Sequence, residues 1–274
     1  MTTPDRCKVF ALALLLVLAG CASRTPGDGP PRSGSVVPAH LPSDPIPRDE
    51  PRSRYGNGPT YEVYGKRYDV MQSNYGYSER GVASWYGKKF HGRPTSSQEP
   101  YDMYAMTAAH KTLPLPSFVE VRNLRNNKTV IVRVNDRGPF VSNRIIDLSY
   151  SAAIKLDMIG SGTSLVEVTA ISFDKPPTTR PARASQTRTA TPRAVAAGEI
   201  YVQVGAFGDK NNAQRRFNLL REHGIRDAFL YAESGRSSSL YRVRIGPIAD
   251  VDQYDRVVSK LERIGITETH IVTE

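Results

Sequence analysis

The chain has 274 residues, of which 39% are hydrophobic, and its 37 lysines and arginines outnumber 27 aspartates and glutamates. The net charge of +10 favours an anionic or polymeric partner, and the length allows about two domains. Two cysteines exclude a disulfide scaffold, and no apolar run reaches the roughly 18 residues of a membrane-spanning helix. The 20 prolines and 21 glycines gather in particular stretches, which predicts compact domains on tethers.

The first 20 residues have the form of a secretory signal. A basic start and an apolar core from Val9 to Leu18 are followed by Leu18-Ala19-Gly20-Cys21. These four residues resemble a bacterial lipobox, which implies cleavage before Cys21 and lipidation of its thiol. Two or more acyl chains would anchor the mature chain stably to a membrane, and Ala22 after the cysteine implies the outer membrane. The alternative is an ordinary cleaved signal with a chance cysteine.

Two stretches have compositions that cannot support a packed core. Residues 22 to about 50 are mainly Pro, Gly, Ser and Arg, so we expect them to be disordered. Residues 21–80 are thus interpreted as a lipid-anchored tether and pre-barrel segment. Residues 175–198 are rich in Pro, Thr, Ala and unopposed Arg, which predicts an extended linker. The two folded units are then residues 81–174 and 199–274.

The last unit, residues 199–274, contains an internal repeat with an offset of 41 residues. Val202-Gln203-Val204-Gly205 aligns with Val243-Arg244-Ile245-Gly246, and Gly224 aligns with Gly265. Each half has an alternating strand, an apolar helix face closed by glycine, and a second strand. Two such halves predict a ferredoxin-like βαββαβ unit, with both helices on one side of a four-stranded antiparallel sheet.

Alternation along the long strands sends four side chains to the open face of this sheet. They are Tyr201, Gln203, Arg242 and Arg244. The stretches Tyr201 to Phe207 and Leu240 to Pro247 resemble the SPOR domain, which binds glycan strands stripped of peptides at division septa. The resemblance implies that these four residues bind glycan. The sheet alone would equally suit RNA, although the secretory signal argues against it, and the arginines could simply keep an exposed sheet soluble.

Runs of β-branched residues predict short strands in the unit of residues 81–174. They are Val119–Val121, Val130–Val134 and Leu165–Phe173. Ser149 is a suitable N-cap for one short helix. A six-stranded barrel would remove exposed strand edges in a unit of about ninety residues.

Motifs in the same unit resemble the rare lipoprotein A (RlpA) family. They are Gly81 to Gly87, Phe90-His91-Gly92, Thr107 to Pro114 and Val132 to Phe140, and the match continues through Asp147-Leu148-Ser149. The resemblance implies a double-psi β-barrel related to expansins and to one class of lytic transglycosylases. The expected fold is therefore mainly β plus α+β. Ser96-Ser97-Gln98-Glu99 departs from the Asn-Gly that often precedes the glutamate, and Asn126-Asn127 replaces an Asn-Gly turn.

The resemblance also implies a reaction, the cleavage of the MurNAc–GlcNAc bond without water to leave 1,6-anhydro-muramyl ends. The muramyl 6-hydroxyl is the nucleophile, so the protein must supply only a proton donor and a proton acceptor. The candidates by motif position are Glu99, Asp102, His110 and Asp136. We favour Glu99 or Asp136 as general acid and base, with His110 and Asp102 orienting the carboxyl group. Alternatively, the carboxylates are only solvated, or Asp136 pairs with a neighbouring arginine.

Aromatic residues flank these motifs and would either stack on sugar rings or fill the barrel core. They are Trp85, Tyr86, Phe90 and Tyr101. No spacing of His, Cys, Asp or Glu matches a zinc or calcium motif, so we predict neither a metal nor a cofactor.

Together these features predict an envelope lipoprotein anchored at Cys21 in the outer membrane and facing the periplasm, enriched at the division septum. Residues 199–274 would bind peptide-free glycan, residues 81–174 would cleave it, and no nucleic acid would be bound. The competing interpretation is a septal glycan-binding lipoprotein whose expansin-like barrel does not turn over substrate.

Overall fold

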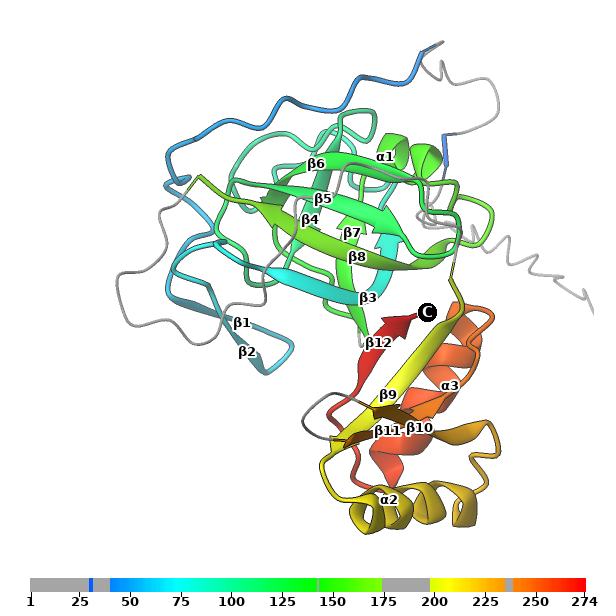
Figure 1. Cartoon of the computed structure of the whole chain (residues 1–274). Coiled ribbons are helices and arrows are strands. Elements are labelled where there is room, and N and C mark those ends of the chain that lie inside the picture. Colours follow the sequence, from blue (N-terminus) through cyan, green and yellow to red (C-terminus); the bar gives the residue numbers. More distant parts are fainter. Residues whose placement is uncertain (1–29, 32–39, 142, 174–197, 235–238) are drawn as a thin grey trace, which may run out of the picture.

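The computed structural model describes residues 30–31, 40–141, 143–173, 198–234 and 239–274, which form two folded units (Figure 1). The predictions on the signal peptide and on lipidation of Cys21 fall outside the described residues. So does the predicted linker, apart from its last residue, Gly198.

The first unit is a closed six-stranded barrel, as predicted. Its strands are β3 (Ser78–Trp85), β4 (Thr107–His110), β5 (Ser117–Asn123), β6 (Thr129–Asp136), β7 (Arg144–Leu148) and β8 (Thr163–Ile171). They close in the order β3-β7-β4-β6-β5-β8. The pairs β3–β7 and β4–β6 are parallel, and the other neighbouring pairs are antiparallel. The closed ring pairs both edges of every barrel strand.

Alternation along the strands places apolar side chains inside the barrel. Val132, Val134, Ile146 and Leu148 are fully buried there, and each such side chain contributes about 1.5–3 kcal/mol through its burial. The helix α1 (Tyr150–Lys155) follows β7, and Ser149 caps it by accepting a hydrogen bond from the Ala152 amide at 3.3 Å. The helix and its cap were both predicted.

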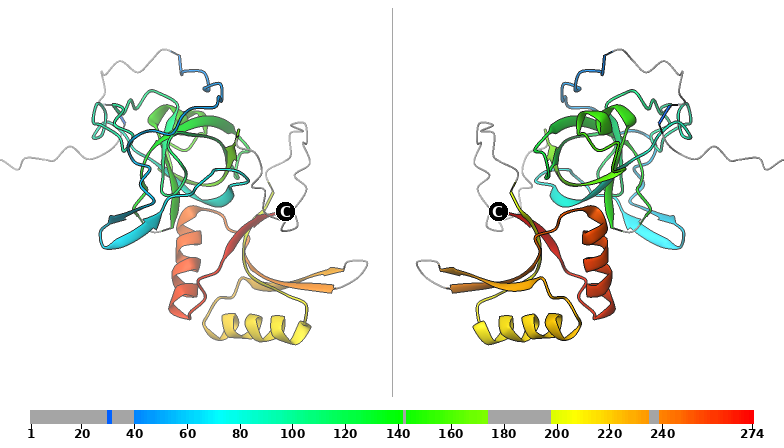
Figure 2. Two further views of the ribbon diagram at one scale, coloured as in Figure 1. Left: turned by 90° about the vertical axis from the view of Figure 1, so that its left-hand side faces the viewer. Right: turned by 90° about the vertical axis from the view of Figure 1, so that its right-hand side faces the viewer.

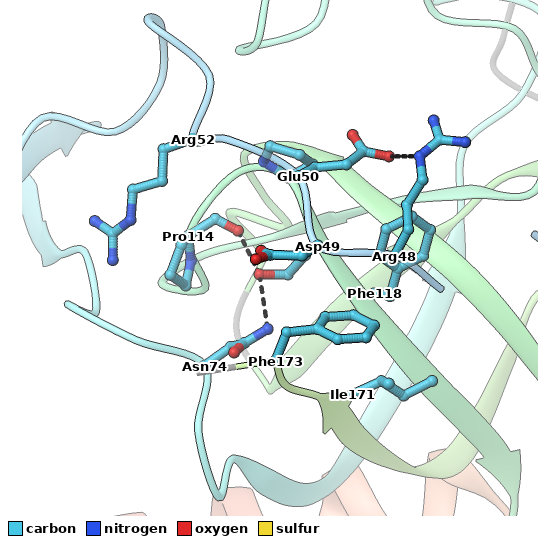
Figure 3. A pocket seen from close by; sticks show the side chains of 11 residues that line it. Arg48, Asp49, Glu50, Arg52, Asn74, Pro114, Phe118, Ile171 and Phe173 are labelled. Atoms are coloured by element: carbon cyan, nitrogen blue, oxygen red, sulfur yellow. Dashed lines mark hydrogen bonds and ion pairs between the residues drawn. The ribbon is translucent and has the colours of Figure 1, made fainter. Parts of the chain in front are cut away.

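The segment before the barrel is bound to it. Residues 40–59 have no regular secondary structure, and a hairpin follows, formed by β1 (Thr60–Val63) and β2 (Lys66–Asp69). Asp44 accepts from the Ile131 amide at 2.7 Å and pairs with Lys155 at 2.7 Å. Figure 3 shows residues 48–50 of this segment lining a pocket together with Phe118 and Ile171 of the barrel. The expected disorder up to about residue 50 is therefore wrong for residues 40–50, because these polar contacts offset the entropy of ordering the chain.

The second unit has the predicted βαββαβ order. Its elements are β9 (Ile200–Phe207), α2 (Lys210–Glu222), β10 (Ala228–Ser234), β11 (Ser239–Ile245), α3 (Val251–Arg263) and β12 (His270–Thr273). The antiparallel sheet runs β10-β11-β9-β12. Both helices cover one face, and the other face carries no helix (Figure 2).

The sequence repeat extends to the ends of both helices. Asp209 and Asp250 are the N-caps, and they accept hydrogen bonds from the third amide of α2 and α3 at 2.9 and 2.7 Å. Gly224 and Gly265 follow the helices with φ of +73° and +78°, a conformation that favours glycine. None of the helices in the described ranges is long and apolar enough to cross a membrane.

Candidate functional site

Three neighbouring strands bring two aspartates to the outer surface of the barrel. Strand register places Ala109 of β4 between Asp136 of β6 and Asp147 of β7. Ala108 precedes Ala109 in β4 and Ile146 precedes Asp147 in β7, and both Ala108 and Ile146 are buried in the barrel core. Because successive side chains of a strand point to opposite faces, Ala109 and Asp147 face outward, and so does their partner Asp136. Neighbouring strands lie about 4.8 Å apart, so the Cα atoms of the two aspartates are separated by about 10 Å.

The carboxylate of Asp136 is held by three donors at one oxygen. The Ser96 amide (2.8 Å), the Ser96 hydroxyl (2.7 Å) and the Arg137 amide (2.7 Å) all donate to Oδ1. Among the residues that the structure describes, no donor binds Oδ2. These three hydrogen bonds therefore fix the orientation of the carboxylate.

Glu99 lies beside this site in a forked ion pair. Arg133 donates to Oε2 at 2.7 Å and to Oε1 at 3.0 Å, and Asn135 donates to Oε2 at 2.8 Å. Burial alone would raise the pKa of Glu99, but these hydrogen bonds and the positive charge of Arg133 outweigh it and hold the pKa below its usual value. Glu99 is therefore ionised at neutral pH.

One loop joins Glu99 to Asp136. Its Ser96 binds Asp136, and the Ser97 amide donates to the Asn135 carbonyl at 3.3 Å. Gln98 has φ of +69°, a left-handed conformation, so the loop keeps a tight turn despite the departure of its sequence from the family motif. The structure thus brings Glu99 and Asp136 together.

His110 points away from the two carboxylates. Its ring is 2% exposed, and Nδ1 accepts hydrogen bonds from the Thr112 and Leu113 amides at 3.2 and 3.1 Å. Nε2 therefore carries the proton and donates to the Tyr77 hydroxyl at 2.8 Å. Burial, together with the charges of Arg137 and Lys111, lowers the pKa of His110 to about 3. The imidazole is therefore neutral at physiological pH.

Asp102 is also separate from the carboxylate site. Its exposed side chain accepts from the Tyr104 amide at 2.9 Å and lies 3.6 Å from Nδ1 of His91. No hydrogen bond or ion pair between described residues links Asp102 or His110 with Glu99 or Asp136. The structure therefore groups two of the four predicted residues and places the other two elsewhere.

Asp147 is a candidate that the sequence reasoning did not single out. The Ser84 hydroxyl donates to its Oδ1, and Arg144 donates to the Ser84 hydroxyl at 3.0 Å. The available signal was the match of Asp147-Leu148-Ser149 to the family. Asp147 lies near Asp136 because β4 stands between β6 and β7 in the barrel. No pattern among neighbouring residues of the sequence predicts that strand order.

The aromatic residues near the site mostly fill space. Tyr86 and Tyr101 stack at 4.0 Å and are 7% and 2% exposed. Burial raises the pKa of Tyr86, as do Tyr101 and the charges of Asp136 and Asp147, so Tyr86 stays a neutral phenol next to both aspartates. Trp85 packs against the barrel core, and only Phe90 of the four is exposed, at 37%. No group of three or more His, Cys, Asp or Glu side chains in the described ranges is arranged to hold a metal ion.

The open face of the second unit carries a packed polar cluster around Arg244. Register pairs Arg244 with Gln203, and Arg244 Nε donates to the Gln203 amide oxygen at 3.4 Å. The guanidinium lies 4.5 Å from the ring centre of Tyr231 and donates to Glu274. Val202, Val204, Val243 and Ile245 are buried under the helices, as the alternation predicts.

The other predicted residues of this face are less closely associated with Arg244. Tyr201 packs edge-on against Phe229 at 5.4 Å. Arg242 lies opposite Ala206 because a bulge between Val243 and Arg244 shifts the register. Phe229 and Tyr231 of β10 add aromatic rings that the sequence reasoning missed, because it assigned open-face side chains only on the strands now seen as β9 and β11.

Comparison with known proteins identifies both units. Residues 78–168 match the family model described as lytic transglycolase, and residues 196–271 match the SPOR domain model. An endolytic peptidoglycan transglycosylase RlpA of Vibrio cholerae is 39% identical over 96% of this chain and 95% of its own length. An RlpA of Pseudomonas aeruginosa with the same description is 36% identical over 77% of this chain and 75% of its own length.

Among solved structures, the SPOR domain of Pseudomonas aeruginosa RlpA is 25% identical, covers 27% of this chain and 99% of its own chain, and has a TM-score of 0.26. The sequence similarity extends over most of the described residues of both units. The barrel followed by a SPOR unit also agrees with the predicted fold. The chain therefore belongs to the rare lipoprotein A family, whose curated members are lytic transglycosylases.

Proposed function

We propose that this lytic transglycosylase cleaves peptide-free peptidoglycan strands at the division septum and leaves 1,6-anhydro-muramyl ends. One observation carries the assignment of the site. Asp136 is fixed by three donors at Oδ1, no donor among the described residues binds its Oδ2, and an ionised Glu99 lies on the same outer surface. The RlpA relatives named as endolytic peptidoglycan transglycosylases support the reaction.

We assign the proton transfers of this reaction to Asp136, because its three donors all bind Oδ1 and leave Oδ2 to carry the proton. As the acid it gives its proton to the glycosidic oxygen while the bond between that oxygen and C1 of the muramyl sugar breaks. The muramyl 6-hydroxyl then attacks C1, and its proton passes to the carboxylate just formed. One carboxyl group thus serves as acid and then as base, and the protein ends in its starting protonation state.

Glu99 suits a different role. Because Arg133 and Asn135 hold it as an anion, it has no proton to donate at neutral pH. A fixed negative charge beside the cleaved bond stabilises the positive charge that develops on the sugar ring. Asp147 lies on the far side of Ala109, where its negative charge would act on the same sugar.

His110 acts as a positioning residue in this proposal. Its Nδ1 fixes the turn at Thr112 and Leu113, and the carbonyls of His110 and Leu113 accept from Arg137 at 3.2 and 2.6 Å. The Arg137 amide in turn donates to Asp136. His110 thus supports the catalytic carboxylate through Arg137.

The SPOR face would hold the enzyme on its substrate. The exposed ring of Tyr231, packed against the buried Arg244 beside Gln203, provides an aromatic surface suited to sugar rings. A lipid at Cys21 would keep both units near peptidoglycan in the envelope, and binding and cleavage on one polymer raise the effective concentration of the strand.

The test uses the soluble mature chain, peptide-free glycan strands and mass spectrometry of the released fragments. We expect anhydro-muramyl ends from the parent and a loss of at least about 100-fold in their rate of release in Asp136→Asn. Asp102→Asn is the matched control and should keep the parental rate. Binding of strands without release of fragments would replace this proposal with a glycan-binding lipoprotein.

A further inference from the structure

A groove of about 320 Å³ lies beside the carboxylate site. Thr60, Tyr61 and Val63 of β1 line it together with Ser96, Arg137 and Phe140. We call it the hairpin groove. The three β1 residues belong to the β1–β2 hairpin, which lies outside the predicted catalytic unit of residues 81–174.

The hairpin groove shares its wall with the site of Asp136. Ser96 lines the groove and also donates to Asp136 through its amide and its hydroxyl. Arg137 lines the groove with its side chain, while its amide donates to the same carboxylate oxygen. A polymer bound at Asp136 is therefore within reach of the groove without any movement of these residues.

Packed aromatic rings hold the hairpin residues of the groove in place. Tyr61 and Tyr68 stack at 5.2 Å with an interplanar angle of 19°, and Phe140 lies 5.6 Å from Tyr68. The Tyr61 hydroxyl donates to the Lys111 carbonyl at 2.8 Å, and the Arg137 guanidinium lies 5.8 Å from the Tyr61 ring centre. The wall is thus formed before any ligand binds.

The lining fits one sugar ring. Val63, Phe140 and the ring of Tyr61 provide an apolar surface, and Thr60 and Ser96 are polar residues of the lining. A pyranose ring with an N-acetyl group has the matching combination of apolar C–H faces, a methyl group and hydrogen-bonding edges. Few polar groups on a mostly apolar, preformed surface are typical of small-molecule subsites.

We propose that the hairpin groove binds an N-acetylhexosamine ring of the glycan strand, adjacent to the sugar at Asp136. This proposal rests on the proposed function. It extends the substrate contact beyond the barrel to the β1–β2 hairpin. Strands long enough to reach the groove are then bound more tightly than short ones.

A substitution that fills the groove tests this proposal. Val63→Trp places a large ring in the groove, whereas Tyr64→Trp adds the same side chain at the next position, which is 93% exposed and does not line the groove. We expect Val63→Trp to raise KM for long peptide-free strands roughly tenfold. Turnover of fragments too short to reach the groove should be unchanged, and Tyr64→Trp should match the parent with both substrates.

The outcomes separate the two proposals. A parent that releases no anhydro-muramyl fragments contradicts the proposed function, whereas an active Val63→Trp variant with parental KM for long strands contradicts the subsite. Circular dichroism of both tryptophan variants shows whether each is folded.

A binding measurement tests the groove even without turnover. In the full soluble chain, the NMR signals of the Val63 methyl groups should shift on addition of a peptide-free glycan hexasaccharide, and Phe140→Ala should weaken that titration. Unmoved Val63 signals at concentrations that shift other residues of the barrel would overturn the proposal.

Discussion

Arg133 joins the segment before the barrel to the candidate site. Its guanidinium donates to Glu50 at 3.0 and 2.8 Å and to Glu99 at 2.7 and 3.0 Å. The side chains of Arg133 and Glu50 are only 21% and 13% exposed, and that of Glu99 is 40% exposed. The substitution Arg133→Gln removes this charge, leaves Glu99 without its counter-ion and leaves Glu50 paired, among the described residues, only with the exposed Arg48 at 2.8 Å.

The expected loss in the free energy of unfolding follows from these exposed fractions. Removing Arg133, the better buried of the two arginines that pair with Glu50, costs about 1–3 kcal/mol, whereas solvent screening limits the loss at Glu99 to no more than about 1 kcal/mol. We therefore expect Arg133→Gln to destabilise the barrel by about 2–4 kcal/mol at pH 7. Arg125→Gln is the matched control, because Arg125 is an exposed arginine of the same barrel, and it should change stability by less than about 0.5 kcal/mol.

The assay is urea unfolding of the soluble chain followed by tryptophan fluorescence. Trp85 is the only tryptophan in the sequence and lies in β3, so its signal reports on the barrel and not on the SPOR unit. Equal unfolding midpoints for Arg133→Gln and Arg125→Gln would refute this reasoning.

The ion pair of Arg133 with Glu99 makes the destabilisation by Arg133→Gln depend on pH. The pKa of Glu99 is depressed in the folded chain, so its contribution to stability is present above the unfolded-state value of about 4.3. It is lost as pH falls through the lower folded value. The difference between parent and Arg133→Gln should therefore shrink below about pH 4. A difference that stays constant down to pH 3 would contradict the assigned ionisation of Glu99.

Three further predictions concern His110, Arg244 and Asp147. The pKa of His110 falls to about 3 in the folded chain, so barrel stability should drop by about 1.4 kcal/mol per pH unit below about pH 6.5. His110→Gln should abolish that slope in urea unfolding, and a retained slope would assign it to another group. Arg244→Ala should weaken binding of peptide-free strands at least about tenfold in co-sedimentation while Arg221→Ala, an exposed arginine of α2, does not; equal losses would indicate non-specific charge. Asp147→Asn should lower kcat more than about tenfold with KM little changed, and parental kcat would remove Asp147 from the site.

Local sequence patterns were sufficient for much of the fold. The repeat with its 41-residue offset predicted the second unit, because each half carries its own strand alternation, helix face and terminal glycine. In the barrel, β-branched runs marked β5, β6 and β8, and Ser149 marked the start of α1. These signals are encoded within a few neighbouring residues.

Contacts between distant residues account for what was missed. The β1–β2 hairpin has short, half-exposed strands, and its tyrosines pack against Phe140, about 80 residues later in the chain. Its turn at Tyr64 and Gly65, with φ of +51° and +74°, left only the glycine as a local signal. The ion pair of Glu50 with Arg133 spans 83 residues and was likewise invisible to composition.

The candidate site was predicted only in part for the same reason. The motifs identified Glu99 and Asp136, and the loop through Ser96 does bring them together. The motifs could not show that the His110 ring turns toward Tyr77, or that β4 places Asp147 beside Asp136. Those relations depend on how the six strands are ordered around the barrel.

The central claim is that bond cleavage uses the sugar's own hydroxyl group and Asp136. It is tested most directly by digesting peptide-free strands in water enriched in heavy oxygen and measuring the masses of the new chain ends by mass spectrometry. We predict 1,6-anhydro ends without heavy oxygen from the parent and almost none from Asp136→Asn. Heavy oxygen in the new ends, or anhydro ends at the parental rate from Asp136→Asn, would contradict it.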